Sequence, residues 1–316
     1  MPISAMHFGR KKVEIEEDIT PQKAHDYVRK PQNVWIDVIN EDNEELKDIL
    51  ALVFPEYYNL ILEDCIEDTR PKIERYKDIT FIVFKTTPGS DLNYSQMSVI
   101  MGNNFLLTIR RGKTDLSKVK SFFMDNEQHN VDFVIYKIFE IVFGSYLRAL
   151  DKVEDKIEAF EENAIKNPKI AGLAEIMELK KKLFQLHKIL ASQREIVAIL
   201  FKGEVQHIKP KTRVYLRDTY DDITKLIDLA ETYRDTAKGL IELHLSSTSA
   251  QVSEVMKVLT AIATFVLVPS LIASIYGMNF THLPLKDWQY GYEFTLAIMG
   301  LLVFAIYLFF KKKQWI

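Results

Sequence analysis

Cysteine is almost absent from this sequence, in which Cys65 is the only one. A single cysteine excludes an internal disulfide framework and any metal site built on a CxxC pair, and it fits a reducing compartment. We therefore interpret Cys65 as a small buried apolar side chain.

A charge excess of one sign is lacking too. The chain has 41 Lys plus Arg against 44 Asp plus Glu, which indicates no basic surface for nucleic acid. No GxxxxGK[ST] loop is present, which argues against an ATP-driven pump. Because the sequence contains no nucleophile–base constellation and no cofactor motif, an enzyme is the least favoured class.

Long uncharged runs occur only near the C-terminal end. Residues 258–275 are 18 uncharged positions, and residues 291–310 contain a single acid, Glu293. At ~1.5 Å per helical residue these runs reach roughly 27 and 30 Å, which is enough to cross a hydrocarbon core of ~30 Å. We predict two transmembrane helices.

The lysines around these runs predict their orientation. Lys257 precedes the first run, residues 311–313 follow the second, and only Lys286 lies between them. The positive-inside rule then places both termini in the cytoplasm. The first 30 residues lack the apolar core of a secretory signal, in agreement with that orientation.

The remainder of the chain shows two patterns. Residues 35–39 and 81–84 predict strands, and residues 99–101 and 105–107 predict a hairpin around Gly102-Asn103-Asn104. From residue 131 the apolar spacing becomes helical; charged Asp132, Lys137 and Glu140 argue against a membrane span there. Asn167-Pro168 ends that helix, and a second helix is predicted from about residue 170 to residue 201.

Residues 212–276 contain no strong helix breaker before Pro269 and follow a 3-4 apolar spacing. As one helix they would extend about 98 Å, so the helix must leave the bilayer and continue as a stalk. The predicted fold is an α/β N-terminal cytoplasmic domain, a long helical stalk and two transmembrane α-helices. Its expected parts are a cytoplasmic α/β domain (1–125), a cytoplasmic helical hairpin (126–211), the stalk helix (212–257), a pore-lining first span (258–276), an external loop (277–290), a second span (291–310) and a basic cytoplasmic tail (311–316).

The first span carries small and polar side chains among its larger apolar ones. Those that share one helical face by steps of three and four are Ser253, Met256, Leu259 (or Thr260), Ala263, Leu267, Ser270, Ser274 and Gly277. This face would line a pore, or it would serve close helix packing, and both interpretations stay open. A pore requires several copies of the chain, because one helix cannot enclose a water path.

The first span ends in Tyr276-Gly277-Met278-Asn279-Phe280. Taken alone, Gly277 followed by Asn279 is a helix stop, in which glycine can take the left-handed conformation. Together with the segment EVMKVLT (254–260), Trp288, AIMG (297–300) and the ending KKKQWI (311–316), this motif resembles the CorA magnesium channels. The resemblance is dense over residues 212–316 and looser before them.

The resemblance implies a homopentameric funnel in the inner cell membrane that admits magnesium. It implies a selectivity filter at Gly277, Met278 and Asn279, whose uncharged oxygens would hold hydrated Mg²⁺, and a hydrophobic constriction at Met256, Leu259 and Leu267. Segments LEDCIED (62–68) and LRDTY (216–220) resemble the regulatory region of the family. They imply that Asp64, with Glu63 close by, faces Asp218 of a neighbouring subunit across a regulatory magnesium ion. No organic cofactor is expected.

Two other classes remain as alternatives. A zinc or broad divalent cation (cobalt, nickel) transporter would use the same scaffold, although His244 and His282 do not have the spacing of a zinc site. A membrane-anchored coiled coil without transport would explain the stalk and the spans alone.

Overall fold

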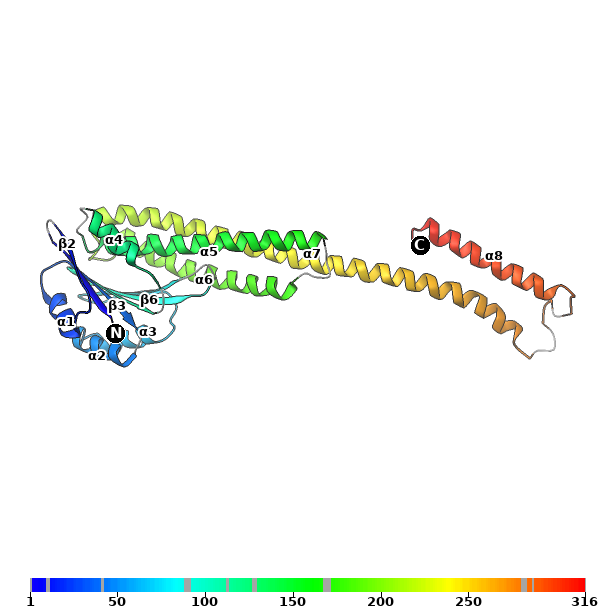
Figure 1. Cartoon of the computed structure of the whole chain (residues 1–316), viewed down its shortest axis with the longest axis horizontal. Helices are drawn as coiled ribbons and strands as arrows, with labels where there is room; N and C mark the ends of the chain where they lie inside the picture. Colours follow the sequence, from blue (N-terminus) through cyan, green and yellow to red (C-terminus); the bar gives the residue numbers. More distant parts are fainter. Residues whose placement is uncertain are drawn as a thin grey trace. The chain divides into compact units, whose positions relative to one another are not determined.

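The computed structural model describes residues 2–9, 12–40, 43–87, 92–111, 114–126, 130–166, 172–279, 283–285 and 287–315. The chain divides into two compact units (Figure 1), which are Met1–Glu162 with Gly172–Leu240, and Asn163–Ala171 with Ile241–Ile316. The predicted helix break at Asn167-Pro168 lies outside the described residues, as do His282 and Lys286.

The first unit is built on a seven-stranded sheet of order β2-β1-β3-β7-β6-β5-β4. Its strands are β1 (Ile3–Phe8), β2 (Val13–Glu16), β3 (Val34–Asn40), β4 (Lys72–Arg75), β5 (Thr80–Thr86), β6 (Ser95–Met101) and β7 (Phe105–Arg111). The predicted hairpin is confirmed, because β6 and β7 pair antiparallel with Met101 opposite Leu106. β3 and β7 form the parallel pair, with Val34 opposite Phe105.

The sequence patterns did not predict β1, β2 or β4. β2 and β4 are four-residue edge strands, VEIE and KIER, in which charged residues interrupt the apolar ones, so their patterns are too short to stand out. β1 pairs with both β2 and β3, and this completes the sheet on that side.

Helices cover both faces of the sheet (Figure 1). On one face lie α1 (Pro21–Arg29), α2 (Asn43–Val53) and α3 (Tyr58–Ile66), whose buried side chains join strand residues in one apolar core. Cys65 belongs to that core with 2% of its surface exposed, which confirms the interpretation made from the sequence. α3 is the helix that carries Glu63 and Asp64.

The opposite face is covered by α4 (Ser117–Asp125), α5 (Phe133–Lys166) and α6 (Leu173–Lys202). The rings of Phe84 on β5 and Phe139 on α5 pack with centroids 5.2 Å apart. The buried Tyr146 hydroxyl donates a hydrogen bond to the Lys85 carbonyl at 2.9 Å. α5 and α6 begin and end within about three residues of the predicted helices, and α5 is packed in a folded unit as expected.

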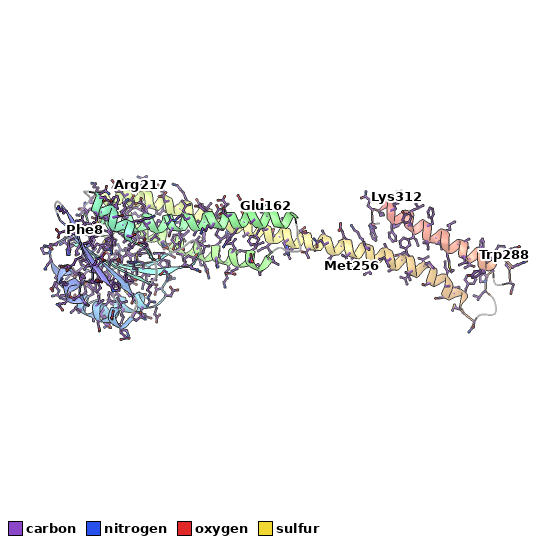
Figure 2. The ribbon with its side chains drawn as sticks, viewed as in Figure 1. Phe8, Glu162, Arg217, Met256, Trp288 and Lys312 are labelled. Carbon is purple, nitrogen blue, oxygen red and sulfur yellow. The ribbon has the colours of Figure 1, made fainter. Side chains whose placement is uncertain are left out.

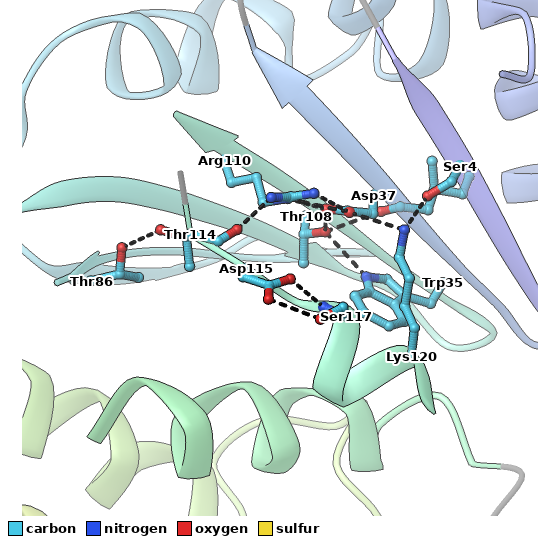
Figure 3. A network of polar contacts seen from close by, with 11 residues as sticks. Ser4, Trp35, Asp37, Thr86, Thr108, Arg110, Thr114, Asp115, Ser117 and Lys120 are labelled. Atoms are coloured by element: carbon cyan, nitrogen blue, oxygen red, sulfur yellow. Dashed lines mark hydrogen bonds and ion pairs between the residues drawn. The ribbon is translucent and has the colours of Figure 1, made fainter. Parts of the chain in front are cut away.

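A buried polar network ties β3 and β7 to α4 (Figure 3). Asp37 is 2% exposed and accepts hydrogen bonds from Arg110 Nε at 3.1 Å and from Thr108 Oγ1 at 2.8 Å. Lys120 of α4 lies 3.5 Å from Asp37 and donates to Ser4 at 2.7 Å. The Asp37 charge is therefore paired, as a buried carboxylate requires.

The longest helix, α7 (Pro210–Tyr276), runs from the first unit into the second and contains Pro269. Its 67 residues agree with the single long helix expected from the sequence and correspond to about 100 Å. Asp132, which precedes α5, caps the N-terminal end of α7. It accepts hydrogen bonds from the Lys209 backbone N–H at 2.9 Å and from the Thr212 hydroxyl at 2.7 Å. This buried carboxylate joins the start of α5 to the start of α7.

Candidate functional site

In the second unit, the last part of α7 is followed by α8 (Gly291–Lys312), and both are long and apolar enough to cross a membrane. Phe265 of α7 and Phe310 of α8 pack with ring centroids 5.9 Å apart. Trp315 stacks on Phe310 at 5.5 Å, beside the basic end of the helix. Figure 2 shows Trp288 and Lys312 at opposite ends of α8. Aromatic rings and lysines are enriched at the two surfaces of a membrane, so these positions suit a helix that crosses it.

The predicted pore face of α7 is exposed along its whole length. Every member of it is exposed in the chain: Ser253, Met256, Leu259, Ala263, Leu267, Ser270 and Ser274. The residues of 257–276 that are at least partly covered form a different row: Lys257, Ala261, Thr264, Phe265, Val268, Pro269 and Ile272. At about 100° per residue, the centres of the two rows lie on roughly opposite sides of the helix. The pore face therefore points away from the side that packs against α8.

The hydroxyl groups of this helix fall into two classes. Thr260 donates to the Met256 carbonyl at 2.7 Å, and Thr264 donates to the Thr260 carbonyl at 2.8 Å. These hydroxyls are satisfied by their own helix. The hydroxyls of Ser253, Ser270 and Ser274 make no hydrogen bond within the described part of the chain, so they are free to bind water or an ion.

The predicted filter directly follows the last residue of α7. The Gly277 backbone N–H donates to the Ala273 carbonyl at 2.9 Å, and that of Met278 donates to the Ile275 carbonyl at 3.3 Å. α7 ends at Tyr276, so the helix stop is confirmed, but Gly277 does not take the left-handed conformation that was thought to make it. Asn279 is exposed, and its side chain has no hydrogen bond to the described residues.

Gly277 and Gly291, which flank the loop between α7 and α8, differ in whether the space around them has room for a side chain. A Cβ atom at Gly291 would lie 2.1 Å from the Leu285 carbonyl oxygen, so the close approach of this backbone requires glycine. A Cβ atom at Gly277 would lie 3.4 Å from the Ala273 carbonyl oxygen, which is ordinary contact. The single chain thus explains Gly291 and gives no steric reason for Gly277.

The predicted regulatory carboxylates lie in the first unit. Asp64 has a side chain that is 15% exposed, and its Oδ2 lies 2.5 Å from Nζ of Lys72 on β4. Lys72 also pairs with Glu74 at 2.8 Å. Partial burial acts to lower the pKa of Lys72, but the hydrogen bonds to Asp64 and Glu74 outweigh it and raise this pKa. Lys72 could not be predicted from the sequence, because only the pairing of β4 with the sheet brings it to α3.

The segment after Asp64 is held by buried polar groups. Gln96 Nε2 donates to the Asp64 carbonyl at 2.6 Å, and the Thr69 backbone N–H donates to Gln96 Oε1 at 2.8 Å. Lys85, whose side chain is 7% exposed, pairs with Asp68. These contacts fix the end of α3, whereas Glu63 is exposed on the same helix.

Asp218 is exposed on α7 and lines a cavity of about 330 Å³ together with Tyr136, Glu140 and Asp222. The rest of the lining comes from α5 and α7 and is mostly apolar: Phe143, Gly144, Leu147, Thr219, Lys225, Leu226 and Leu229. Burial, with the charges of Glu140 and Asp218, raises the pKa of Tyr136 to about 12. The cavity lining therefore combines mostly apolar side chains with the carboxylates of Glu140, Asp218 and Asp222.

One chain does not bring the predicted regulatory residues into a common site. Asp64 is absent from the lining of the cavity that contains Asp218. Among the described residues, no group of three or more His, Cys, Asp or Glu side chains is arranged to hold a metal ion. The acidic side chains Asp151, Glu154, Asp155, Glu158 and Glu161 of α5 are all exposed, so they form a solvated face.

Known proteins match this chain over almost its whole length. The family model described as CorA-like Mg2+ transporter protein matches residues 30–312. The chain belongs to this family. The cobalt/magnesium transport protein CorA of Thermotoga maritima is 33% identical over 81% of this chain and 76% of its own length. That of Methanocaldococcus jannaschii is 26% identical over 90% of this chain and 91% of its own length.

A solved structure supports the same assignment. The complete structure of the CorA magnesium transporter from Methanocaldococcus jannaschii has a TM-score of 0.83 and 25% identity, and the match covers 99% of this chain and 98% of that one. It shares the α/β N-terminal domain, the long helix and the two membrane helices. Members of this CorA-like family are divalent cation transporters and not enzymes, and this member is a membrane protein with two spans.

Proposed function

We propose that this chain is one subunit of a channel that lets hydrated magnesium enter the cell. The observation that carries the proposal is the uncharged face of α7, which points away from the α8 side and leads to Gly277, Met278 and Asn279. Several copies around an axis would turn this face inward, and the family resemblance implies five. Both termini would lie in the cytoplasm of a cell with this protein in its inner membrane.

The filter chemistry suits magnesium. Mg²⁺ is small, gives up its water reluctantly and prefers oxygen ligands in octahedral geometry. Rings of Asn279 amide oxygens and Gly277 carbonyls would accept hydrogen bonds from the waters of the hydrated ion, without a carboxylate charge that would hold it too tightly. Met256, Leu259 and Leu267 would form a hydrophobic constriction that closes by excluding water.

Entry needs no chemical energy source. A membrane potential contributes ~2.3 kcal/mol per charge per 100 mV, or about 4.6 kcal/mol for a divalent cation. The direction of transport would then follow from the potential and from the orientation that the flanking lysines favour.

Internal magnesium would close the channel. Asp64, with Glu63 nearby, would face Asp218 of the next subunit and hold a regulatory Mg²⁺ between them. Two carboxylates ~6 Å apart at an effective dielectric constant of ~20 repel by ~2.8 kcal/mol. Shifting a two-state equilibrium from 1:99 to 99:1 requires ~5.5 kcal/mol, so loss of the ion at two or three interfaces is sufficient to open the pore.

Ion flux through purified full-length protein in proteoliposomes tests the filter. We expect Asn279→Ala to change magnesium flux and selectivity strongly, and Gln289→Ala, an exposed amide in the same loop, to leave both unchanged. Equal flux in the wild type and Asn279→Ala would refute the filter and favour a structural coiled coil. A series of magnesium, cobalt, nickel and zinc, with and without a proton gradient, separates a magnesium channel from a zinc or broad divalent transporter.

The regulatory proposal has its own experiment. We expect the Asp64→Ala plus Asp218→Ala double variant to conduct at millimolar internal magnesium, which inhibits the wild type. The matched control is Asp48→Ala plus Asp228→Ala, which removes two exposed acids from α2 and α7. Inhibition that survives in the first double variant would remove Asp64 and Asp218 from the regulatory site.

A further inference from the structure

Asp64 is already paired with a positively charged group of its own chain, the ammonium group of Lys72. Lys72 Nζ lies 2.5 Å from Asp64 Oδ2 and 2.8 Å from Glu74 Oε1, so the ammonium group bridges two carboxylates. The side chains of Lys72 and Asp64 are only 28% and 15% exposed. The lysine therefore takes up a position that is suitable for a hard metal cation with oxygen ligands.

The surrounding contacts keep this arrangement in place. The Tyr76 hydroxyl donates to Glu74 Oε2 at 2.6 Å, which orients the second carboxylate toward Lys72. Gln96 fixes the backbone at Asp64 through a bond of 2.6 Å to its carbonyl. Because Lys72 lies on β4, which pairs with β5 in the sheet, the base of its side chain is fixed as well.

We propose that Lys72 is an internal competitor for the divalent cation at Asp64 and sets the magnesium concentration at which the regulatory site fills. This inference rests on the proposed regulation by Asp64 and Asp218, and it adds to that site a residue that sets its affinity for magnesium. A divalent cation that binds Asp64 must displace the ammonium group or bind beside it and accept the repulsion. A weak site is useful here, because a sensor must respond near the working concentration of its ion.

The size of the effect follows from electrostatics. At about 5 Å and with the dielectric constant of bulk water, repulsion between a single and a double positive charge weakens binding by about 16-fold. A lower local dielectric constant would increase this factor, and movement of the flexible lysine side chain would reduce it. We therefore expect removal of the Lys72 charge to lower the half-inhibiting magnesium concentration by about tenfold.

The test compares full-length Lys72→Met, Lys72→Arg and Lys47→Met in proteoliposomes. Lys47 is the matched control, since it pairs with Glu44 on α2 at 2.7 Å. We expect the half-inhibiting magnesium concentration to fall about tenfold for Lys72→Met and to stay within threefold of the wild type for the other two. A second measurement, magnesium-dependent protection of the detergent-solubilised protein from proteolysis, should shift by the same factor and does not depend on flux.

The outcomes separate this inference from the proposal beneath it. If the Asp64→Ala plus Asp218→Ala variant is still inhibited, the regulatory site itself is wrong and the role of Lys72 falls with it. If that variant escapes inhibition while Lys72→Met responds to the same magnesium concentration as the wild type, only the role of Lys72 is overturned. Lys72→Gln makes the same charge change and decides the matter should Lys72→Met fail to assemble.

Discussion

The two glycines that flank the outer loop allow the filter to be tested apart from the fold. Gly277→Ala places a methyl group 3.4 Å from the Ala273 carbonyl oxygen and 3.5 Å from that of Ser274, which is normal contact distance. The backbone at Gly277 lacks a positive φ, so alanine is not strained there. Replacing glycine by alanine where the native backbone suits both stabilises a protein by about 0.4–1 kcal/mol, because the unfolded chain loses freedom, and we expect the stability of the variant to be unchanged or slightly raised.

Ion flux should respond in the opposite way. If Gly277 lines the filter, a ring of methyl groups narrows it and replaces access to carbonyl oxygens with apolar surface. We expect magnesium flux to fall at least tenfold, which corresponds to a barrier higher by about 1.4 kcal/mol. The measurement is the initial rate of magnesium entry into proteoliposomes, reported by an enclosed fluorescent indicator and normalised to the amount of inserted protein.

Gly291→Ala is the matched structural control. Its methyl group would lie 2.1 Å from the Leu285 carbonyl oxygen, so backbone must move. Such overpacking costs about 1–3 kcal/mol, and thermal unfolding in detergent should shift to lower temperature. A Gly277→Ala protein that is stable and conducts magnesium at the wild-type rate would refute the reasoning, because no constraint on that glycine would remain.

Further predictions concern the first unit. Asp37→Ala removes the partner of Arg110, whose side chain is 12% exposed; an unpaired buried charge should lower the free energy of unfolding by about 3–5 kcal/mol, measured by chemical denaturation, and a loss below 1 kcal/mol would contradict this. Asp132→Ala removes the cap of α7 and should cost about 1–2 kcal/mol, with faster hydrogen exchange confined at first to the N-terminal turn of α7. Burial raises the pKa of Cys65 to about 12, so its thiolate is roughly a thousandfold scarcer than that of an ordinary cysteine at neutral pH. Alkylation of Cys65 should therefore be slow in the folded protein and rapid after denaturation. Fast labelling of the folded protein would count against the buried position.

Local sequence patterns were sufficient to predict the long helices and the membrane parts of the chain, but not the short helices α1 to α4. The hydropathy of residues 258–275 and 291–310 depends only on neighbouring side chains. The 3-4 spacing of apolar residues that begins at residue 212 continues into the first of these segments without a break. The long helix was therefore predicted close to its observed end at Tyr276. The motif at residues 276–280, with the family resemblance that it carries, identified the candidate filter.

Edge strands and buried partners could not be predicted in this way. β2 and β4 are short and contain many charged residues, and they become strands because β1 and β5 offer them backbone hydrogen bonds. Lys72 is one lysine among many in the sequence, and nothing local marks it as the partner of Asp64. The strand register and the buried ion pair of Asp37 with Arg110 depend on the same long-range pairing.

The sequence by itself determined where the long helices lie, which segments are apolar enough to cross a membrane, and to which family the chain is similar, because these properties reside in residues a few positions apart. Only the tertiary structure decided which face of α7 is left uncovered beside α8, which of Gly277 and Gly291 its own backbone requires, and which cation already occupies Asp64. Each of these depends on contacts between residues that are distant in sequence, and such contacts form only when the elements pack together.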